Sequence, residues 1–201
     1  MREAEVGSAA NARSLIQQAG KLSNGKVTAA LTALVSAQIG DYKKALSLSE
    51  TLDKQFPHGT LVQGFWLPMI RGEIDLRQGR GPGAVEKLSA AGPLDAGDAD
   101  GCAISPLLPT YLLGRAYLVA GEGGKAEDEF RKLLDNRGMV LNSPFGALAY
   151  LGEARAYSLD GKPVEARKAY QAFFNIWKDA DRSIPLLREA QTEAGRLTTA
   201  R

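Results

Sequence analysis

Apolar residues recur along this chain at intervals of three and four positions, the spacing of one face of an α-helix. The stretch Tyr111–Leu134 shows this most clearly. Its first half places Leu112 and Ala116 on one face, and its second half does the same with Ala126 and Phe130. A glycine-rich turn separates the halves, so the stretch predicts two short helices joined by a turn. Apolar and polar residues never alternate over a long run, so no strand is expected.

A glycine, followed five residues later by alanine and nine residues later by a usually apolar residue, recurs along the sequence. The matches are Gly7–Ala12–Ile16, Gly40–Ala45–Ser49, Gly79–Ala84–Leu88, Gly121–Ala126–Phe130 and Gly161–Ala166–Tyr170. Successive glycines lie 33, 39, 42 and 40 residues apart. Glycine readily adopts the left-handed conformation that closes a helix, and alanine lets two helices approach closely. Five matches at nearly regular spacing predict a helical repeat.

The same pattern predicts ten helices in one array over residues 1–201. They are expected at 8–19, 26–38, 41–53, 60–78, 83–90, 105–120, 125–136, 143–160, 163–177 and 184–197. Pro68 should start its helix or kink it, because proline lacks the N–H that the helix needs. The array divides into a half repeat (1–20), helix pairs at 25–57, 60–91, 105–136 and 143–178, and a capping helix at 183–198. The half repeat suggests a chain that continues from a longer parent.

Composition narrows the classes of function. The chain has 201 residues, 44% of them hydrophobic, and a formal net charge of +2. The small charge gives no general case for binding nucleic acid or an acidic membrane. No apolar run reaches the roughly 18–20 residues that cross a bilayer, and the first residues lack the apolar centre of a signal peptide. We therefore expect a soluble protein with no membrane insertion by this chain; the cytoplasm is favoured, and the periplasm stays open for a tail that lies beyond a membrane span.

Two local patterns suggest chemistry, and each has a simpler interpretation. The run Gly121–Ala126 looks like a phosphate-binding loop, but Val119 and Ala126 stand where that loop needs glycine and a hydroxyl residue, which favours a repeat turn. The acidic loop Asp95–Gly101 looks like a calcium loop, but Leu107 stands where the liganding glutamate is required. We expect no metal and no cofactor.

The two remaining reactive candidates are single residues. Cys102 is the sole cysteine, which excludes an intrachain disulfide and a cysteine-based zinc site. His58 is the sole histidine and follows a proline in a predicted turn. A nucleophilic pair of the two is weighed far below a surface role for His58, because nothing in the sequence supplies an orienting partner. We therefore expect no enzyme activity from this chain.

Two of the units resemble the tetratricopeptide repeat (TPR). That family has a small residue in the first helix, an aromatic residue three positions on, then alanine and an aromatic residue in the second helix. The matching residues are Gly114, Tyr117, Ala126 and Phe130, and then Ala154, Tyr157, Ala166 and Tyr170. The two earlier full units depart from the pattern. The resemblance implies an all-α solenoid of antiparallel helix pairs, coiled into a right-handed superhelix with a C-terminal capping helix.

The C-terminal runs at 108–121, 130–161 and 166–185 resemble the TPR region of bacterial serine/threonine protein kinases, and similar tails of winged-helix regulators. The chain has no kinase catalytic loop, no Asp-Phe-Gly segment and no ATP-binding glycine loop. The resemblance therefore implies a regulatory or sensory tail that docks a partner without chemistry.

In TPR proteins the concave surface is lined by the first helix of each pair, and stacked repeats form such a surface in general. Carried onto this chain, the groove residues are Trp66, Met69, Glu73, Arg77, Leu108, Tyr111, Arg115, Leu118, Leu148, Leu151 and Arg155. Arg115 and Arg155 occupy equivalent positions one repeat apart. They are candidates to clamp a carboxylate or phosphate of an extended peptide. The competing interpretation, which we weigh slightly higher, is solubility or a salt bridge with Glu73 or Glu153.

The function favoured by the sequence is a non-catalytic module that binds a protein or peptide in this groove. An alternative is a scaffold that self-associates, as a homodimer for instance, through Trp66, Met69 and the first helix. An unrecognised helical enzyme using Cys102 or the acidic loop comes last. Reversing the charge of Arg115 and Arg155 is predicted to weaken partner capture and to leave the helices intact.

Overall fold

In the computed structural model the described residues, 1–92, 107–140 and 143–199, form helices and no strand. The helices are α1 (Arg2–Glu5), α2 (Ala9–Leu22), α3 (Lys26–Gln38), α4 (Tyr42–Gln55), the π-helix η1 (Val62–Trp66), α5 (Leu67–Arg77), α6 (Gly81–Ser89), α7 (Leu108–Ala120), α8 (Gly123–Asp135), α9 (Arg137–Val140), α10 (Phe145–Leu159), α11 (Pro163–Ile176) and α12 (Pro185–Thr199). The all-helical prediction is confirmed. The structure adds α1 and α9, which are single turns and too short to show an apolar period.

The glycines of the sequence repeat close the turns. Positive φ angles, between +66° and +90°, occur at Gly7, Gly40, Gly79, Gly121 and Gly161. At each of them the backbone N–H that follows the glycine donates to a carbonyl five residues earlier, as in Glu122 to Tyr117 at 2.9 Å. This is the hydrogen bond of a Schellman turn, which satisfies a carbonyl at the end of the helix. The predicted role of these glycines is confirmed.

Pro68 lies in a helix that continues past it. The π-helix η1 runs directly into α5, and the Leu67 N–H donates to the Val62 carbonyl, five residues back. The proline ring would otherwise clash with the carbonyl four residues before it. The wider π turn just ahead of Pro68 is the local adjustment where the sequence predicted a start or a kink.

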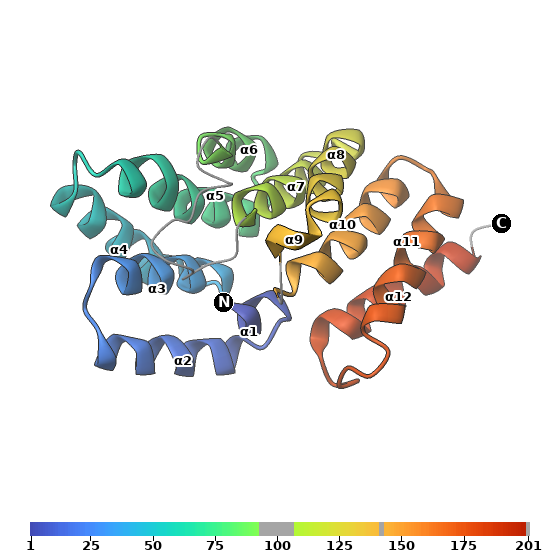
Figure 1. Cartoon of the computed structure of the whole chain (residues 1–201), viewed down its shortest axis with the longest axis horizontal. Coiled ribbons are helices and arrows are strands. Elements are labelled where there is room, and N and C mark those ends of the chain that lie inside the picture. The colour runs from blue at the N-terminus through green and yellow to red at the C-terminus, as the bar shows by residue number, and fades with distance from the viewer. Residues whose placement is uncertain (93–106, 141–142, 200–201) are drawn as a thin grey trace.

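The helices α3, α5, α7 and α10 contact one another in series, and we call them the first-helix row. Each also packs against the helix that follows it in the pair, namely α4, α6, α8 and α11. Figure 1 shows the helices following an arc, with α2 beneath α3 and α12 at the other end. Between these ends lies α1, which contacts α3 and also reaches the start of α12: the Leu186 N–H donates to the Val6 carbonyl at 3.4 Å.

The main apolar core extends along the first-helix row, from Ala30 in α3, and continues to Ala190 in α12. In its centre Phe130 of α8 is fully buried between α7 and α10. A Cβ atom at Gly114 would lie 2.9 Å from the Phe130 ring, and one at Gly152 would lie 2.5 Å from it. Both glycines are therefore needed to admit the ring.

A second, smaller cluster holds the first two helices. It consists of Ala4, Ala12, Ile16 and Val35. In α2, which has 14 residues, only Ala12 and Ile16 are buried. The segment α1–α2 is thus attached through far less apolar surface than the later helices.

The packing of α6 against α7 depends on Gly81. A Cβ atom there would lie 2.5 Å from the Ala120 backbone nitrogen, and a backbone atom has little freedom to move away. We expect Gly81→Ala to lower the free energy of unfolding by about 1–3 kcal/mol, the usual cost of overpacking. The matched control is Gly146→Ala in α10, where the new Cβ would meet nothing within 4 Å. That variant should gain about 0.5–1 kcal/mol. Urea denaturation measures both, and equal stability of Gly81→Ala and wild type would contradict the close contact.

Candidate functional site

Polar side chains form a ladder along the first-helix row and α1. Glu73, Arg115 and Arg155 each stand six residues before a turn glycine, and Glu5, Gln38 and Arg77 each stand two residues before one. Positions four apart lie on the same face of a helix. The repeat therefore places these groups on equivalent faces of successive helices.

Glu5 is the group that α1 contributes to this ladder, and its carboxylate is buried. Its side chain is 1% exposed. One oxygen accepts from the Tyr111 hydroxyl and from Arg115 Nη1, each at 3.3 Å, and the other accepts from the Gln38 amide. Burial raises the pKa of Glu5 above its ordinary value, and the charge of Arg115 opposes this only in part. Glu5 is thus bound by α3 and α7 together.

Arg115 also serves a second carboxylate. Its Nη1 lies 3.6 Å from an oxygen of Glu73, which is fully buried and accepts from Arg77 Nε at 2.7 Å. We call Glu5, Gln38, Glu73, Arg77, Tyr111 and Arg115 the Glu5 cluster. Its two carboxylates balance its two guanidinium groups. Two of its buried acceptors, Gln38 Oε1 and Glu73 Oε2, have no hydrogen-bond partner among the described residues.

Arg155 holds the last helix in place. Its guanidinium donates to Glu189 at 3.0 Å and to both oxygens of Glu193 at 3.0 Å. The Tyr170 hydroxyl donates to Glu193 as well, also at 3.0 Å. Burial raises the pKa of Tyr170, and the neighbouring carboxylate of Glu193 adds to the shift. These contacts join α10 and α11 to α12.

Both candidate clamp arginines are therefore engaged within the chain, by α1 and α12. The salt bridge between Arg115 and Glu73, the competing interpretation, is present. Glu153, the other carboxylate named for that interpretation, pairs instead with Arg131 of α8 at 3.1 Å. The acidic partners Glu5, Glu189 and Glu193 were missed, since they lie in segments outside the predicted helix pairs or in the cap.

Burial divides the eleven predicted groove residues. Seven of them are buried in this conformation: Trp66, Met69, Glu73, Leu108, Tyr111, Leu148 and Leu151. The four that keep some exposure are Arg77, Arg115, Leu118 and Arg155. Trp66 and Met69 are both 0% exposed, so the expectation that they form a self-association surface is wrong for this conformation.

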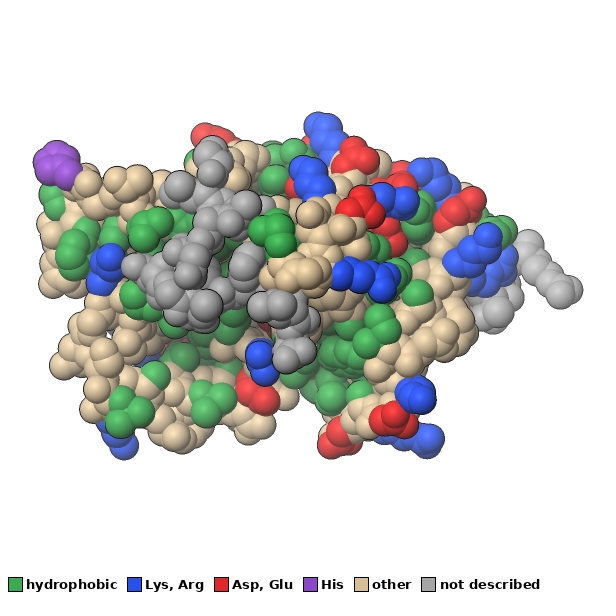
Figure 2. Space-filling view, viewed as in Figure 1, with side chains coloured by type: hydrophobic (Ala, Val, Ile, Leu, Met, Phe, Trp, Pro, Cys, Tyr) green, Lys and Arg blue, Asp and Glu red, His purple; other side chains and the backbone are tan. Residues whose placement is uncertain are grey.

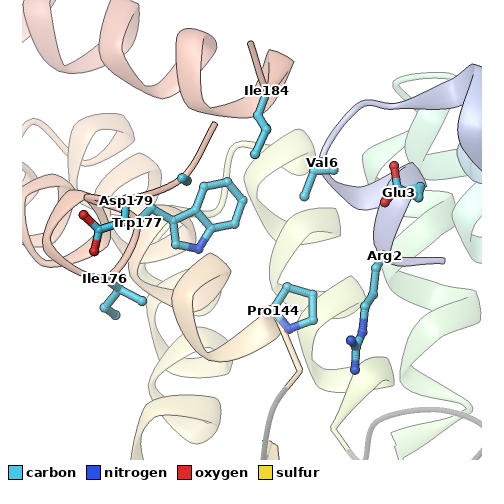
Figure 3. A pocket seen from close by; sticks show the side chains of 9 residues that line it. Arg2, Glu3, Val6, Pro144, Ile176, Trp177, Asp179 and Ile184 are labelled. Carbon is cyan, nitrogen blue, oxygen red and sulfur yellow. The ribbon is translucent and has the colours of Figure 1, made fainter. Parts of the chain in front are cut away.

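A pocket of about 500 Å³ lies where α1 meets the connection between α11 and α12. We call it the seam pocket. It is lined by Arg2, Glu3, Val6, Pro144, Ile176, Trp177, Asp179, Ala180 and Ile184. In Figure 3 Trp177 projects from one side toward Val6 on the other, with Pro144 and Arg2 at one end. The pocket joins segments some 175 residues apart, which no local sequence pattern indicates.

Charged residues on one outer face pair with one another. Figure 2 shows Lys, Arg, Asp and Glu side chains gathered over α8 and its neighbours. Arg131 donates to Glu127 at 3.2 Å and to the Tyr157 hydroxyl at 2.7 Å, and Lys132 donates to Glu129 at 2.8 Å. Because both signs alternate, this face offers no large single-sign surface to a nucleic acid.

The remaining chemical candidates find no supporting geometry in the described part of the chain. Gly121 closes a helix, and Lys125 in the same run pairs with Glu122. His58 is exposed. Asp95, Asp98, Asp100 and Cys102 lie outside the described residues. Within the described residues no group of three His, Cys, Asp or Glu could hold a metal ion, and no helix has the length and apolarity to span a bilayer.

Comparison with protein-family models, curated proteins and solved structures finds no significant match. The resemblance to TPR units and to kinase tails therefore stays a prediction. The first-helix row, α1, α12 and the seam pocket are the parts of the molecule whose geometry bears on function.

Proposed function

We propose that this chain is a TPR-like array of antiparallel helix pairs in a right-handed superhelix, and that it binds a segment of another protein without catalysing a reaction. The contact pattern supports the array: each helix of the row touches the next, and each second helix touches the first helix of the following pair. Such stacking creates an extended inner surface in repeat proteins. A regulatory tail of a larger bacterial protein, a kinase or a transcription regulator, is the context in which we place it.

The observation that carries the proposal is the seam pocket. Ile176 on its wall is 54% exposed, and Trp177 beside it is held by a ring contact of 4.9 Å with the buried Phe173. An aromatic side chain that packs on a buried ring on one side and faces a pocket on the other is a typical anchor point for a partner's apolar residue. In the lining of the pocket, Arg2 supplies a positive charge, and Glu3 and Asp179 supply negative charges. A peptide with one apolar side chain between polar ones fits this arrangement.

Peptide selection tests the proposed function. Peptides enriched from a random library on the intact chain should lose at least tenfold in affinity when Ile176→Asp places a charge in the pocket. The control is Leu22→Asp, at a side chain that is 88% exposed and lies away from the pocket in α2. Fluorescence anisotropy measures the affinities. Failure to enrich any peptide, or equal losses from the two variants, would count against the proposal.

A further inference from the structure

We propose that α1 is the resident occupant of a binding site for a glutamate-bearing helical segment, and that such a segment of a partner replaces it. The site is the part of the Glu5 cluster that stays when α1 leaves: Gln38, Glu73, Arg77, Tyr111 and Arg115. This inference rests on the proposed interaction function and names the chemistry of the segment that is bound. Four observations support it.

The charge balance calls for one carboxylate. Without Glu5 the site holds one carboxylate, Glu73, against the two guanidinium groups of Arg77 and Arg115, a formal charge of +1. Arg115 still has Glu73 at 3.6 Å, so it is not left without a counterion. An incoming glutamate restores neutrality and finds the donors that Glu5 uses. The site therefore favours an acidic side chain over a neutral or basic one.

The resident segment is weakly attached. Ala4, Ala12 and Ile16 are the side chains that α1 and α2 bury in apolar packing. The link to α3 at 23–25 is exposed throughout. Elements with few buried apolar contacts open at a lower free energy than the core. The α1–α2 segment can thus leave without unfolding the first-helix row.

The resident carboxylate does not satisfy the site completely. Gln38 Oε1 and Glu73 Oε2 accept no hydrogen bond from the described residues. A buried acceptor without a donor costs about 1–3 kcal/mol. A segment that carries an N–H donor beside its glutamate would fill these acceptors and so outcompete α1.

Displacement is linked to the seam pocket. The same short segment supplies Arg2, Glu3 and Val6 to the pocket wall. It meets α12 at Gly7, where an added Cβ would lie 3.0 Å from Pro185 Cβ. When α1 leaves, the wall formed by Arg2, Glu3 and Val6 leaves with it, and Trp177 stays in place on the other side. Displacement of α1 therefore changes the seam pocket and opens the site at Arg115 in the same step.

The test uses the full chain and a labelled, acetylated peptide with the sequence of residues 1–22. Glu5→Lys in the chain places a cation opposite Arg115 and should expel α1. We expect the peptide to bind this variant at least tenfold more tightly than the wild-type chain. The same peptide with its glutamate at position 5 replaced by glutamine should bind at least tenfold more weakly. Equal binding of the two peptides, or no binding to a folded Glu5→Lys chain, would overturn the proposal.

Two further measurements keep the test decisive. Glu50→Lys makes the same charge change at an exposed position of α4, outside the cluster and the seam pocket, and should leave the chain as closed to the peptide as wild type. If Glu5→Lys does not fold, Glu5→Gln replaces it. In that variant the rate of backbone hydrogen exchange should rise at least tenfold in α2 and stay unchanged in α7. An unchanged exchange rate in α2 would refute the proposal. The two proposals can fail separately. If the library peptides lose affinity with Ile176→Asp but bind wild type and Glu5→Lys equally well, the displacement of α1 is refuted and the proposed function is not.

Discussion

Replacing Phe130 with alanine is expected to lower the free energy of unfolding by about 3–5 kcal/mol, the range for truncating a large buried side chain. Phe130 is 0% exposed and fills the space between α7 and α10. Its neighbours there include Gly114 and Gly152, which have no side chain to move into the vacated volume. The cavity therefore stays open, and both of the units that resemble TPR lose their shared centre. Chemical denaturation followed by circular dichroism measures the loss.

The matched control is Phe174→Ala in α11. The ring of Phe174 stacks on that of Tyr170, with 6.3 Å between the ring centroids, and its centroid lies 5.5 Å from that of Phe173. Phe174 is only partly buried. Solvent can fill the space that it leaves, so its loss should cost less than half as much. If Phe130→Ala were no more destabilising than Phe174→Ala, α8 would not be packed between α7 and α10 in the way described.

Replacing Arg115 with alanine should be nearly as damaging, at about 3–5 kcal/mol, because it leaves two buried carboxylates without their shared cation. The side chains of Glu5 and Glu73 are 1% and 0% exposed. Their mutual repulsion, together with the lost ion pairs, should separate α1 from the row and loosen α5 against α7. The sequence alone led us to expect that reversing Arg115 would spare the helices; the structure makes a loss of stability the expected result.

A double variant distinguishes this cause from simple loss of packing. Adding Glu5→Gln to Arg115→Ala removes the buried carboxylate that pairs with Arg115, while Glu73 keeps its ion pair with Arg77, so the double variant should lose clearly less stability than the sum of the single losses. The surface control is Arg71→Ala, where Arg71 and Asp53 are 39% and 40% exposed and the loss should stay within about 1 kcal/mol. Strictly additive losses for the double variant would show that Arg115 is not the cation on which Glu5 depends.

These expectations share one consequence for function. The groups that the sequence marked as a peptide clamp also maintain the fold, through α1 on one side and α12 on the other. Removal of Arg155 would likewise release Glu189 and Glu193 of the cap. A partner cannot simply be added to this surface; it has to replace a contact that exists. That is why the proposed exchange centres on α1, whose segment α1–α2 is held by the small apolar cluster of Ala4, Ala12 and Ile16.

Local features of the structure were predictable from the sequence because their causes are local. A left-handed glycine closes a helix wherever it stands, and an apolar residue four positions on shares its face. At Gly40 and Gly121 the positive φ and the hydrogen bond to the carbonyl five residues back both lie within a single turn. Single turns such as α1 were not predicted, because four residues contain no period. The π turn before Pro68 was not predicted either, because more than one backbone adjustment can relieve the clash of the proline ring.

The tertiary structure alone decided which distant groups meet. Glu5 reaches Arg115 across 110 positions of the sequence, and Val6 reaches Leu186 across 180. These contacts depend on how each helix of the first-helix row packs on the next, and on how α1 and α12 pack on that row. The sequence pattern gives the faces of each helix but not the orientation of one helix on another. The sequence therefore determined the helices and their polar faces, and the tertiary packing determined that Glu5 of α1 and Glu189 and Glu193 of α12 occupy those faces.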